Sequence, residues 1–325
     1  EYDDNGYASK ISYFDTKGNP INCSDGNSFL TMKNDEHGNP LEVWYYNVKN
    51  KLCVIRDGEA GCKMEYDSIG NTTKTVFYGV DKMPYLMKDQ TAGWTQTFDD
   101  KSRIVSRTSL GLDLKPCADN NNVICVKVDY DKRGNTTKVA YFDAAGKTLR
   151  LNNEGIAGWK DSYDDSGNHM ERDFFGTDGK PVMSSELQYA CVKYTYDENG
   201  NLSGSRFYNL SGNLTLVDGV AGDIYVKDKR GNTIEHTPIG VNEQLANGRL
   251  KSKYKYDRYD NCIEQSLWDA SGAALNRFDI HIYKYKYNTR NDLVEESYYG
   301  KNGQLTLNSS TNVAIARKEY NDRGE

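Results

Sequence analysis

The sequence predicts an all-β tandem array of β-hairpin repeats, stacked into an elongated β-solenoid or wrapped sheet. An aromatic-Asp-x-x-Gly phrase recurs at near-constant intervals along the 325 residues. The flanking residues are β-branched and aromatic, as in "KTVFYG" and "TKVAYFD", which favours strands. No stretch shows a sustained helical period.

The recurring phrase defines ten repeats and the beginning of an eleventh. It reads "EYDSIGN" from residue 65, "DYDKRGN" from residue 129 and "TYDENGN" from residue 195. The repeats start near residues 1, 33, 65, 97, 129, 162, 195, 226, 255 and 286, with a partial repeat from 319. We interpret residues 1–325 as a single repeat array. Because it lacks an initiator methionine and a signal peptide, we expect a fragment of a longer protein.

Each repeat is expected to run strand, Asp-x-x-Gly turn, strand, second turn, short strand and loop. Asp at the first position of a type I turn accepts hydrogen bonds from nearby backbone N–H groups, and Gly at the fourth supplies a positive φ. The second turn is visible in "FDTKG", "FGTDG" and "YGKNG". Thirty-odd residues cannot bury a core alone, so neighbouring repeats must stack.

Aromatic pairs recur at the thirteenth and fourteenth positions of the repeats. The fourteenth position is large and apolar or aromatic in every repeat, and we expect most of these side chains to be buried: Phe14, Tyr46, Tyr78, Leu110, Phe142, Phe175, Tyr208, Ile239, Trp268 and Tyr299. Successive strand residues face opposite ways. The thirteenth-position rings are therefore either a cross-strand packing ladder or a ligand-facing strip: Tyr13, Tyr45, Phe77, Tyr141, Phe174, Phe207 and Tyr298.

Composition excludes several classes of partner. The net charge of −6 leaves no excess of Lys and Arg to bind a nucleic-acid backbone. No apolar run approaches the ~20 residues that membrane insertion needs. Hydrophobic residues make up 37% of the chain, and 25 tyrosines supply much of the apolar area.

The phrases "YDENGN", "YDKRGN" and "EYDSIGN" resemble the tyrosine-aspartate (YD, or RHS-type) repeats of large bacterial surface and toxin proteins. The resemblance covers the whole chain and implies strand-rich wrapped sheets. A second resemblance, through "GWKDSY" and "YFDAAGK", is to choline- or glucan-binding repeats. Those use paired Gly-Trp motifs in most repeats, whereas Gly-Trp occurs here only at Gly93-Trp94 and Gly158-Trp159.

No catalytic, cofactor-binding or metal-binding constellation is recognisable in the sequence. The four histidines fall at different repeat positions and share no metal-ligand spacing. The acidic turns could each supply half of a calcium loop, but the further oxygen ligands and the late Glu of an EF-hand cannot be placed. We therefore expect a protein that is not an enzyme and that uses no cofactor.

The seven cysteines suggest two disulfides. Cys53 and Cys117 share the twenty-first repeat position, and Cys62 and Cys125 fall near the thirtieth. We therefore predict the bridges Cys53–Cys62 and Cys117–Cys125, each closing a short loop. The alternative is that Cys replaces a small buried hydrophobe. The bridges would place the chain in an oxidising compartment.

These observations favour a non-catalytic, surface-exposed or secreted bacterial repeat segment, extracellular or at the cell surface. It would act as a structural spacer and as a binding or adhesion scaffold for a protein or glycan partner. The alternatives are a carbohydrate-binding module of the glucan- or cell-wall-binding kind, or part of an RHS-like shell around a toxin.

Overall fold

The computed structural model describes residues 1–321. The end of the partial repeat expected from residue 319, residues 322–325, lies outside this part of the chain. The described residues form 21 strands and no helix, which confirms the all-β prediction and its β-hairpin repeats.

The chain divides into two units, and each is described by itself. The first comprises Glu1–Lys160 and Phe174–Val182, and the second comprises Asp161–Asp173 and Met183–Glu325. Strands β10 (Gly158–Tyr163) and β11 (His169–Phe175) contribute residues to both.

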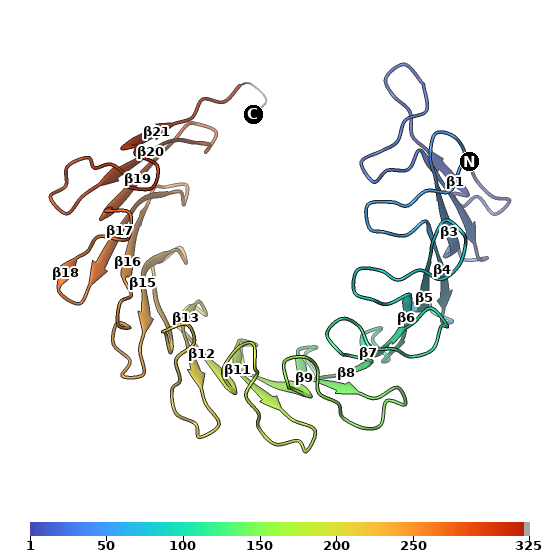
Figure 1. Ribbon diagram of the computed structural model, residues 1–325, viewed down its shortest axis with the longest axis horizontal. Coiled ribbons are helices and arrows are strands. Elements are labelled where there is room, and N and C mark those ends of the chain that lie inside the picture. Colours follow the sequence, from blue (N-terminus) through green and yellow to red (C-terminus); the bar gives the residue numbers. More distant parts are fainter. Residues whose placement is uncertain (322–325) are drawn as a thin grey trace. The chain divides into compact units, whose positions relative to one another are not determined.

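In the first unit the strands follow one another in chain order (Figure 1). Their bounds are β1 (Lys10–Ser12), β2 (Phe29–Asn34), β3 (Pro40–Tyr46), β4 (Gly61–Tyr66), β5 (Thr72–Tyr78), β6 (Gly93–Phe98), β7 (Ile104–Leu110), β8 (Cys125–Tyr130) and β9 (Thr136–Phe142). All the described pairings are antiparallel.

The second unit is built in the same way. Its strands are β12 (Cys191–Tyr196), β13 (Leu202–Tyr208), β14 (Gly222–Lys227), β15 (Thr233–Ile239), β16 (Lys251–Tyr256), β17 (Cys262–Asp269), β18 (Gly272–Ala273), β19 (Ile282–Tyr287), β20 (Leu293–Tyr299) and β21 (Ile315–Arg317). Apart from the two-residue β18, these strands form hairpins, each paired with the next, and the single strand β21 closes the series.

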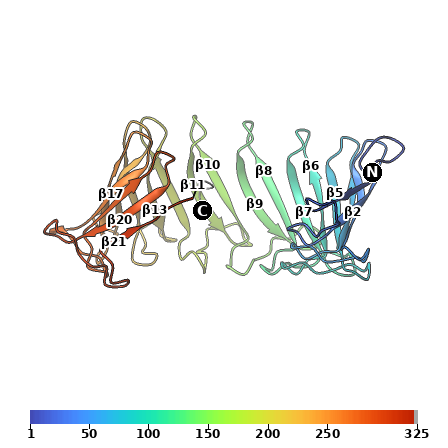
Figure 2. The same ribbon diagram turned by 90° about the horizontal axis from the view of Figure 1, so that it is seen from above.

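Most hairpins turn on the Asp-x-x-Gly phrase, and Ser102, Asp260 and Asn291 take the place of the glycine in three others. In β4–β5 the N–H of Asp67 donates to the carbonyl of Asn71 and the N–H of Gly70 donates to that of Asp67. Gly70 has φ 91°, a region that favours glycine. Figure 2 shows the tight turns of β6–β9 along one edge of the sheet and the longer loops along the other. The expected third strand is reduced to a bridge in most repeats, such as Tyr78↔Pro84.

A β-bulge lies next to the turn, on the second strand of the hairpin. In β4–β5, Glu65 pairs with Lys74 but Tyr66 pairs with Thr72, so one residue of β5 is unpaired. The same shift recurs in the other hairpins, for example at Asp129/Tyr130. A bulge of this kind reverses the side-chain alternation of the strand beyond it.

The two faces of each sheet differ in chemistry. We call the face that carries the turn tyrosines and the thirteenth-position rings the tyrosine face; Tyr66 and Tyr45 lie on it. The opposite face, which carries the fourteenth-position residues and most of the strand lysines, is the lysine face; Tyr78 and Lys63 lie on it. This assignment follows from strand alternation and the register Lys63↔Val76 and Tyr66↔Thr72.

Four alanines are completely buried at the corner where a loop enters the next strand. Ala60, Ala92, Ala157 and Ala221 have no exposed surface. The N–H of Ala92 donates to the carbonyl of Leu110 in the next strand of its hairpin. At the following glycine, Gly93, a Cβ atom would overlap the carbonyl oxygen of Thr75. Glycine therefore permits the close approach in this hairpin, whereas Cys125, Lys251 and Ile282 stand at the equivalent place in other repeats.

The predicted burial of the fourteenth-position residues is only partly met. Leu110, Phe175 and Ile239 are buried, whereas Phe14 is 59% exposed. The other members are half-buried: Tyr46, Tyr78, Phe142, Tyr208, Trp268 and Tyr299. Phe175 packs with Ala140 and Ala157.

Candidate functional site

The turn aspartates are engaged in their own turns. Oδ1 of Asp67 accepts from the N–H groups of Ile69 and Asn71, and Oδ2 accepts from Asn71 Nδ2 at 2.9 Å. The side-chain amide of Asn71 is the main reason why the pKa of Asp67 is lowered. In the irregular fourth repeat Arg103 replaces the asparagine and pairs with Asp99, lowering its pKa to about 2. These carboxylates thus serve as turn-formers.

The turn tyrosine ties its hairpin to the preceding one. Tyr66 Oη–H donates to the carbonyl of Pro40 at 3.0 Å. Pro40 is the first residue of the second strand of the preceding hairpin. The equivalent bonds are Tyr130 to Ile104, Tyr196 to His169, Tyr256 to Thr233, Tyr287 to Cys262 and Tyr320 to Leu293. The tyrosine of the repeated phrase therefore has a structural role within each unit.

Where the tyrosine is missing, another side chain makes the same bond. Phe98 has no hydroxyl, and Gln96 Nε2, two residues earlier, donates to the carbonyl of Thr72 at 2.9 Å. In the second repeat Asn34 Nδ2 donates to the carbonyl of Ala8 at 2.8 Å. Both carbonyls stand at the eighth repeat position, as Pro40 does.

On the lysine face, an ammonium group lies over most fourteenth-position rings. The Nζ–centroid distance is 5.7 Å for Lys63 over Tyr78 and 4.8 Å for Lys253 over Trp268. Further pairs are Lys127–Phe142, Lys160–Phe175, Lys193–Tyr208 and Lys284–Tyr299.

The lysine is absent where the fourteenth residue is aliphatic. Thr95 and Ile224 stand at the equivalent places in the hairpins that carry Leu110 and Ile239. Tyr46 is the exception, because its ring stacks on Phe29 at 4.7 Å. Cation–π contact therefore accounts for the distribution of these lysines.

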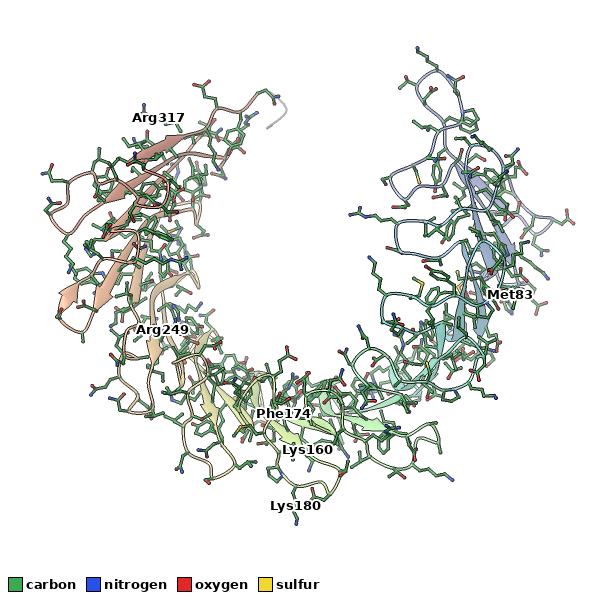
Figure 3. The ribbon with its side chains drawn as sticks, in the orientation of Figure 1. Met83, Lys160, Phe174, Lys180, Arg249 and Arg317 are labelled. Atoms are coloured by element: carbon green, nitrogen blue, oxygen red, sulfur yellow. The ribbon has the colours of Figure 1, made fainter. Side chains whose placement is uncertain are left out.

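The thirteenth-position aromatics lie on the tyrosine face, near the loop edge. Phe174 (Figure 3) and Tyr298 are buried. Tyr13, Tyr45, Phe77, Tyr141 and Phe207 are half-buried. Loop residues cover part of this row, since Tyr189 stacks on Phe207 at 4.9 Å. Ligand contact by these seven rings stays a prediction.

The predicted disulfides Cys53–Cys62 and Cys117–Cys125 are wrong, because all seven cysteines are free. Cys62 is the second residue of β4 and Cys125 is the first residue of β8. This offset of one residue puts their side chains on opposite faces of the sheet. Cys53 Sγ instead lies 4.0 Å from the carbonyl oxygen of Gly26, and Cys125 Sγ lies 3.6 Å from Ser106 Oγ.

One set of three side chains in the second unit has ligand atoms close enough together to bind a metal ion. The ligand atoms of Glu171, Asp173 and Cys191 lie within 4.8 Å of one another. They are also satisfied by protein groups: Cys191 Sγ lies 3.2 Å from Glu171 Oε1, and Lys193 Nζ lies 3.0 Å from the same oxygen. Burial, together with the two carboxylates, raises the pKa of Cys191, which favours the protonated thiol as the donor.

A cleft of about 740 Å³ opens in the second unit beside loop 240–250. Its walls include Leu216, Val241 and Leu245. The guanidinium of Arg249 (Figure 3) donates to the carbonyl of Asp218 at its rim.

Two histidines pair with aspartates on the tyrosine face of the second unit. His169 Nε2 lies 3.0 Å from Asp161 Oδ1, and Arg172 binds the same carboxylate through two bonds of 2.8 Å. His236 Nε2 lies 2.6 Å from Asp223 Oδ1.

A tyrosine column on this face was missed by the sequence reasoning. It consists of Tyr194, Tyr225, Tyr254 and Tyr285, two residues before the turn position in four consecutive repeats. The signal was present in "KYTY", "IYVK", "KYKY" and "KYKY", but it was absorbed into the general abundance of tyrosine.

Among residues 1–321, no helix is long and apolar enough to cross a membrane. No family model matches the chain, and no curated protein matches it.

Among solved structures, similar chains include two from Tc toxin structures. The crystal structure of TcdB2-TccC3-TEV is 12% identical, with a TM-score of 0.39, and the match covers 100% of this chain and 18% of that one. The Photorhabdus luminescens Tc holotoxin pore is 13% identical, with a TM-score of 0.36, and the match covers 97% and 18%. This chain thus spans less than a fifth of those chains, and similarity at this level assigns no family.

Proposed function

We propose that the chain is a non-catalytic bacterial repeat segment, of the YD or RHS-like kind, that acts as a structural spacer and as a scaffold for binding a protein or glycan partner. The observation that supports this most directly is the use of the repeated residues. The turn tyrosine bonds to the preceding hairpin, as Tyr66 does to Pro40. The turn aspartate closes its own turn, as Asp67 does with Asn71.

The arrangement of the titratable groups supports a non-catalytic role. Asp161 and Asp223 hold His169 and His236. His281 is buried, with Nδ1 3.1 Å from the carbonyl oxygen of Ala274. Nucleophilic catalysis requires a base that is hydrogen-bonded to a serine, threonine or cysteine nucleophile. Within residues 1–321, none of these histidines forms such a bond.

Placement outside the cell is part of the same proposal. It was inferred from the predicted disulfides and from the resemblance to bacterial surface and toxin repeats. With every cysteine free, the resemblance alone supports it.

Single-molecule stretching of the intact chain tests the spacer role. In an array of nearest-neighbour repeats, unfolding proceeds in similar steps. Each step should release a contour length of about 110 Å, because an extended chain spans ~3.5 Å per residue. A single cooperative rupture of the whole chain would contradict a modular spacer.

Binding and catalysis are tested separately. The intact chain is screened against immobilised glycans and assayed for hydrolysis of the same glycans. Retention without turnover supports the binding scaffold, and silence on all glycans favours a spacer with a protein partner. Turnover that follows the purified chain would overturn the non-catalytic assignment.

A further inference from the structure

The tyrosine face of the second unit carries a periodic strip of side chains. It consists of the four rings Tyr194, Tyr225, Tyr254 and Tyr285, with a polar cross-strand pair between each two. The pairs are Ser205↔Asp223, His236↔Ser252 and Gln265↔Tyr283, and Glu296 follows the last ring. We call this set the tyrosine strip.

The register sets the spacing of the rings. Tyr194 pairs with Ser205, Ser205 pairs with Asp223, and Tyr225 is two residues further along β14. One repeat therefore advances by two strands sideways and two residues along the strand. The rings are thus roughly 12 Å apart, from strand spacings of about 4.8 Å and a rise of about 3.4 Å per residue.

The rings of the strip differ from the turn tyrosines in their hydroxyl groups. Tyr196 and Tyr256 donate to backbone carbonyls. Tyr194, Tyr225, Tyr254 and Tyr285 form no hydrogen bond through Oη to any residue among 1–321. Burial raises the pKa of Tyr285, so its hydroxyl stays protonated and available as a donor.

The groups between the rings form a shallow polar floor. Ser205 and Ser252 are buried, and their small side chains leave room between the larger rings. Asp223 is held by His236 at 2.6 Å, and Gln265 Nε2 donates to Ser252 Oγ at 3.4 Å. His236 stacks on Tyr225 at 4.9 Å and His169 lies 5.0 Å from Tyr194, so a ligand ring would meet the remaining open tyrosine faces and the hydrogen-bonding groups between them.

The charge of the strip selects among ligands. It contains no lysine or arginine. Arg172 binds Asp161, and Lys227, whose Nζ lies 5.6 Å from the centroid of the Tyr225 ring, donates to Thr233 Oγ1 at 2.7 Å. The strip therefore offers no row of positive charges to bind a polyanion. Because His236 already holds Asp223, only Glu296 is left to attract a polycation. An uncharged ligand complements this surface.

We propose that the tyrosine strip binds an extended, uncharged polysaccharide of hexose or N-acetylhexosamine units. A surface that repeats every hairpin suits a ligand that is itself periodic, as a polysaccharide is and an ordinary peptide is not. Rings supply contact with sugar faces, and the polar floor supplies hydrogen bonds to hydroxyl groups. This inference rests on the proposed role of the chain as a binding scaffold.

Titration of the intact chain with a length series of uncharged oligosaccharides tests the proposal. Affinity should rise with length until the ligand spans the four rings, roughly 36 Å, and then level off. Heparin and a proline-rich peptide form the other arms. Tighter binding of either at the same rings would overturn the assignment.

Three double variants locate the site. Tyr254 and Tyr285 have no ring contact in the described residues. Y254S/Y285S should weaken binding roughly a hundredfold, about tenfold for each ring. Y254F/Y285F, which keeps the rings, should remain within about threefold of the original.

The control is K255S/K286S, on the same strands but on the lysine face, and it should bind unchanged. If K255S/K286S and Y254S/Y285S weaken oligosaccharide binding equally, or if neither weakens it, the tyrosine strip is not the binding site. If glycans still bind in that case, the scaffold role stands without it. The phenylalanine variant decides the matter if the serine variant fails to fold, because binding lost on removing only the hydroxyls contradicts ring stacking.

Discussion

At the residue scale, the hydroxyl of the turn tyrosine distinguishes two otherwise similar columns. Tyr196 and Tyr194 lie two residues apart on β12 and share the tyrosine face. Only Tyr196 reaches a backbone carbonyl, that of His169, at 2.9 Å. The difference arises because Tyr196 lies at the turn end of β12, where the register of β11 with β12 places it beside the start of the preceding hairpin's second strand.

The variants Y196F and Y194F make a matched pair. Y196F should lower the free energy of unfolding by about 1 kcal/mol, because the carbonyl of His169 loses its partner. Y194F removes an unbonded hydroxyl and should change it by less than ~0.5 kcal/mol. Urea denaturation followed by circular dichroism measures both free energies of unfolding. Equal losses would contradict a stabilising bond from Tyr196 to the carbonyl of His169.

The fourth repeat offers the reverse experiment. Q96M removes the bond to the carbonyl of Thr72 and should cost about 1 kcal/mol. Adding F98Y supplies the hydroxyl found in the other repeats and should restore at least the original stability, since Gln96 Oε1 is itself buried without a partner. Failure of F98Y to rescue Q96M would show that the two residues do not share a role.

At the element scale, the hairpin corner controls how closely one hairpin follows another. Gly93 begins β6 with φ 156° and lies against the backbone of Thr75 and Val76 on β5. A side chain there would push the two strands apart, whereas a glycine in a turn has open space around it. At Gly93 both the close approach and the positive φ favour glycine, whereas at a turn glycine such as Gly200 only the dihedral angle does.

G93A should therefore lower the free energy of unfolding by about 3 kcal/mol or more, because the overlap is with backbone that has little freedom to move. The control is G200A, at a turn glycine with φ 80° and nothing within 4 Å. It should cost only about 1 kcal/mol for the left-handed conformation. Thermal unfolding compares them, and a G93A loss no larger than that of G200A would contradict the close approach.

At the scale of the whole molecule, the repeated turns concentrate one kind of titratable group. Seven aspartates accept from an asparagine four residues later, and each has a lowered pKa chiefly for that reason: Asp15, Asp35, Asp67, Asp131, Asp164, Asp197 and Asp257. A folded-state pKa below the unfolded value stabilises the fold above the unfolded value, and this stability is lost as the pH falls.

Acid should therefore destabilise the chain below about pH 4, near the ordinary aspartate pKa of 3.8, with the loss continuing towards pH 2. A variant with Asn at positions 15, 35, 67, 131 and 164 should show a shallower dependence, because Asn209 holds an equivalent turn through Oδ1 without charge. Unfolding midpoints measured from pH 7 to pH 2 provide the test. An unchanged slope in the variant would assign acid sensitivity to other groups.

The sequence alone was sufficient for the all-β repeat and for the position of each turn. Local chemistry decides these features: Asp67 and Gly70 form their turn without help from distant residues, and β-branched and aromatic flanks favour strands. The pattern also located the aromatic pairs on alternate faces.

Side-chain partners across hairpins depended on the tertiary structure. The one-residue offset between Cys62 and Cys125 is small in the sequence, but strand alternation turns it into opposite faces. The bond from Tyr66 to Pro40, and the substitution of Gln96 for a tyrosine hydroxyl, require a register that only the packed hairpins set. Turns are decided within five residues of chain, whereas bonds between hairpins are decided by the register with the neighbouring repeat.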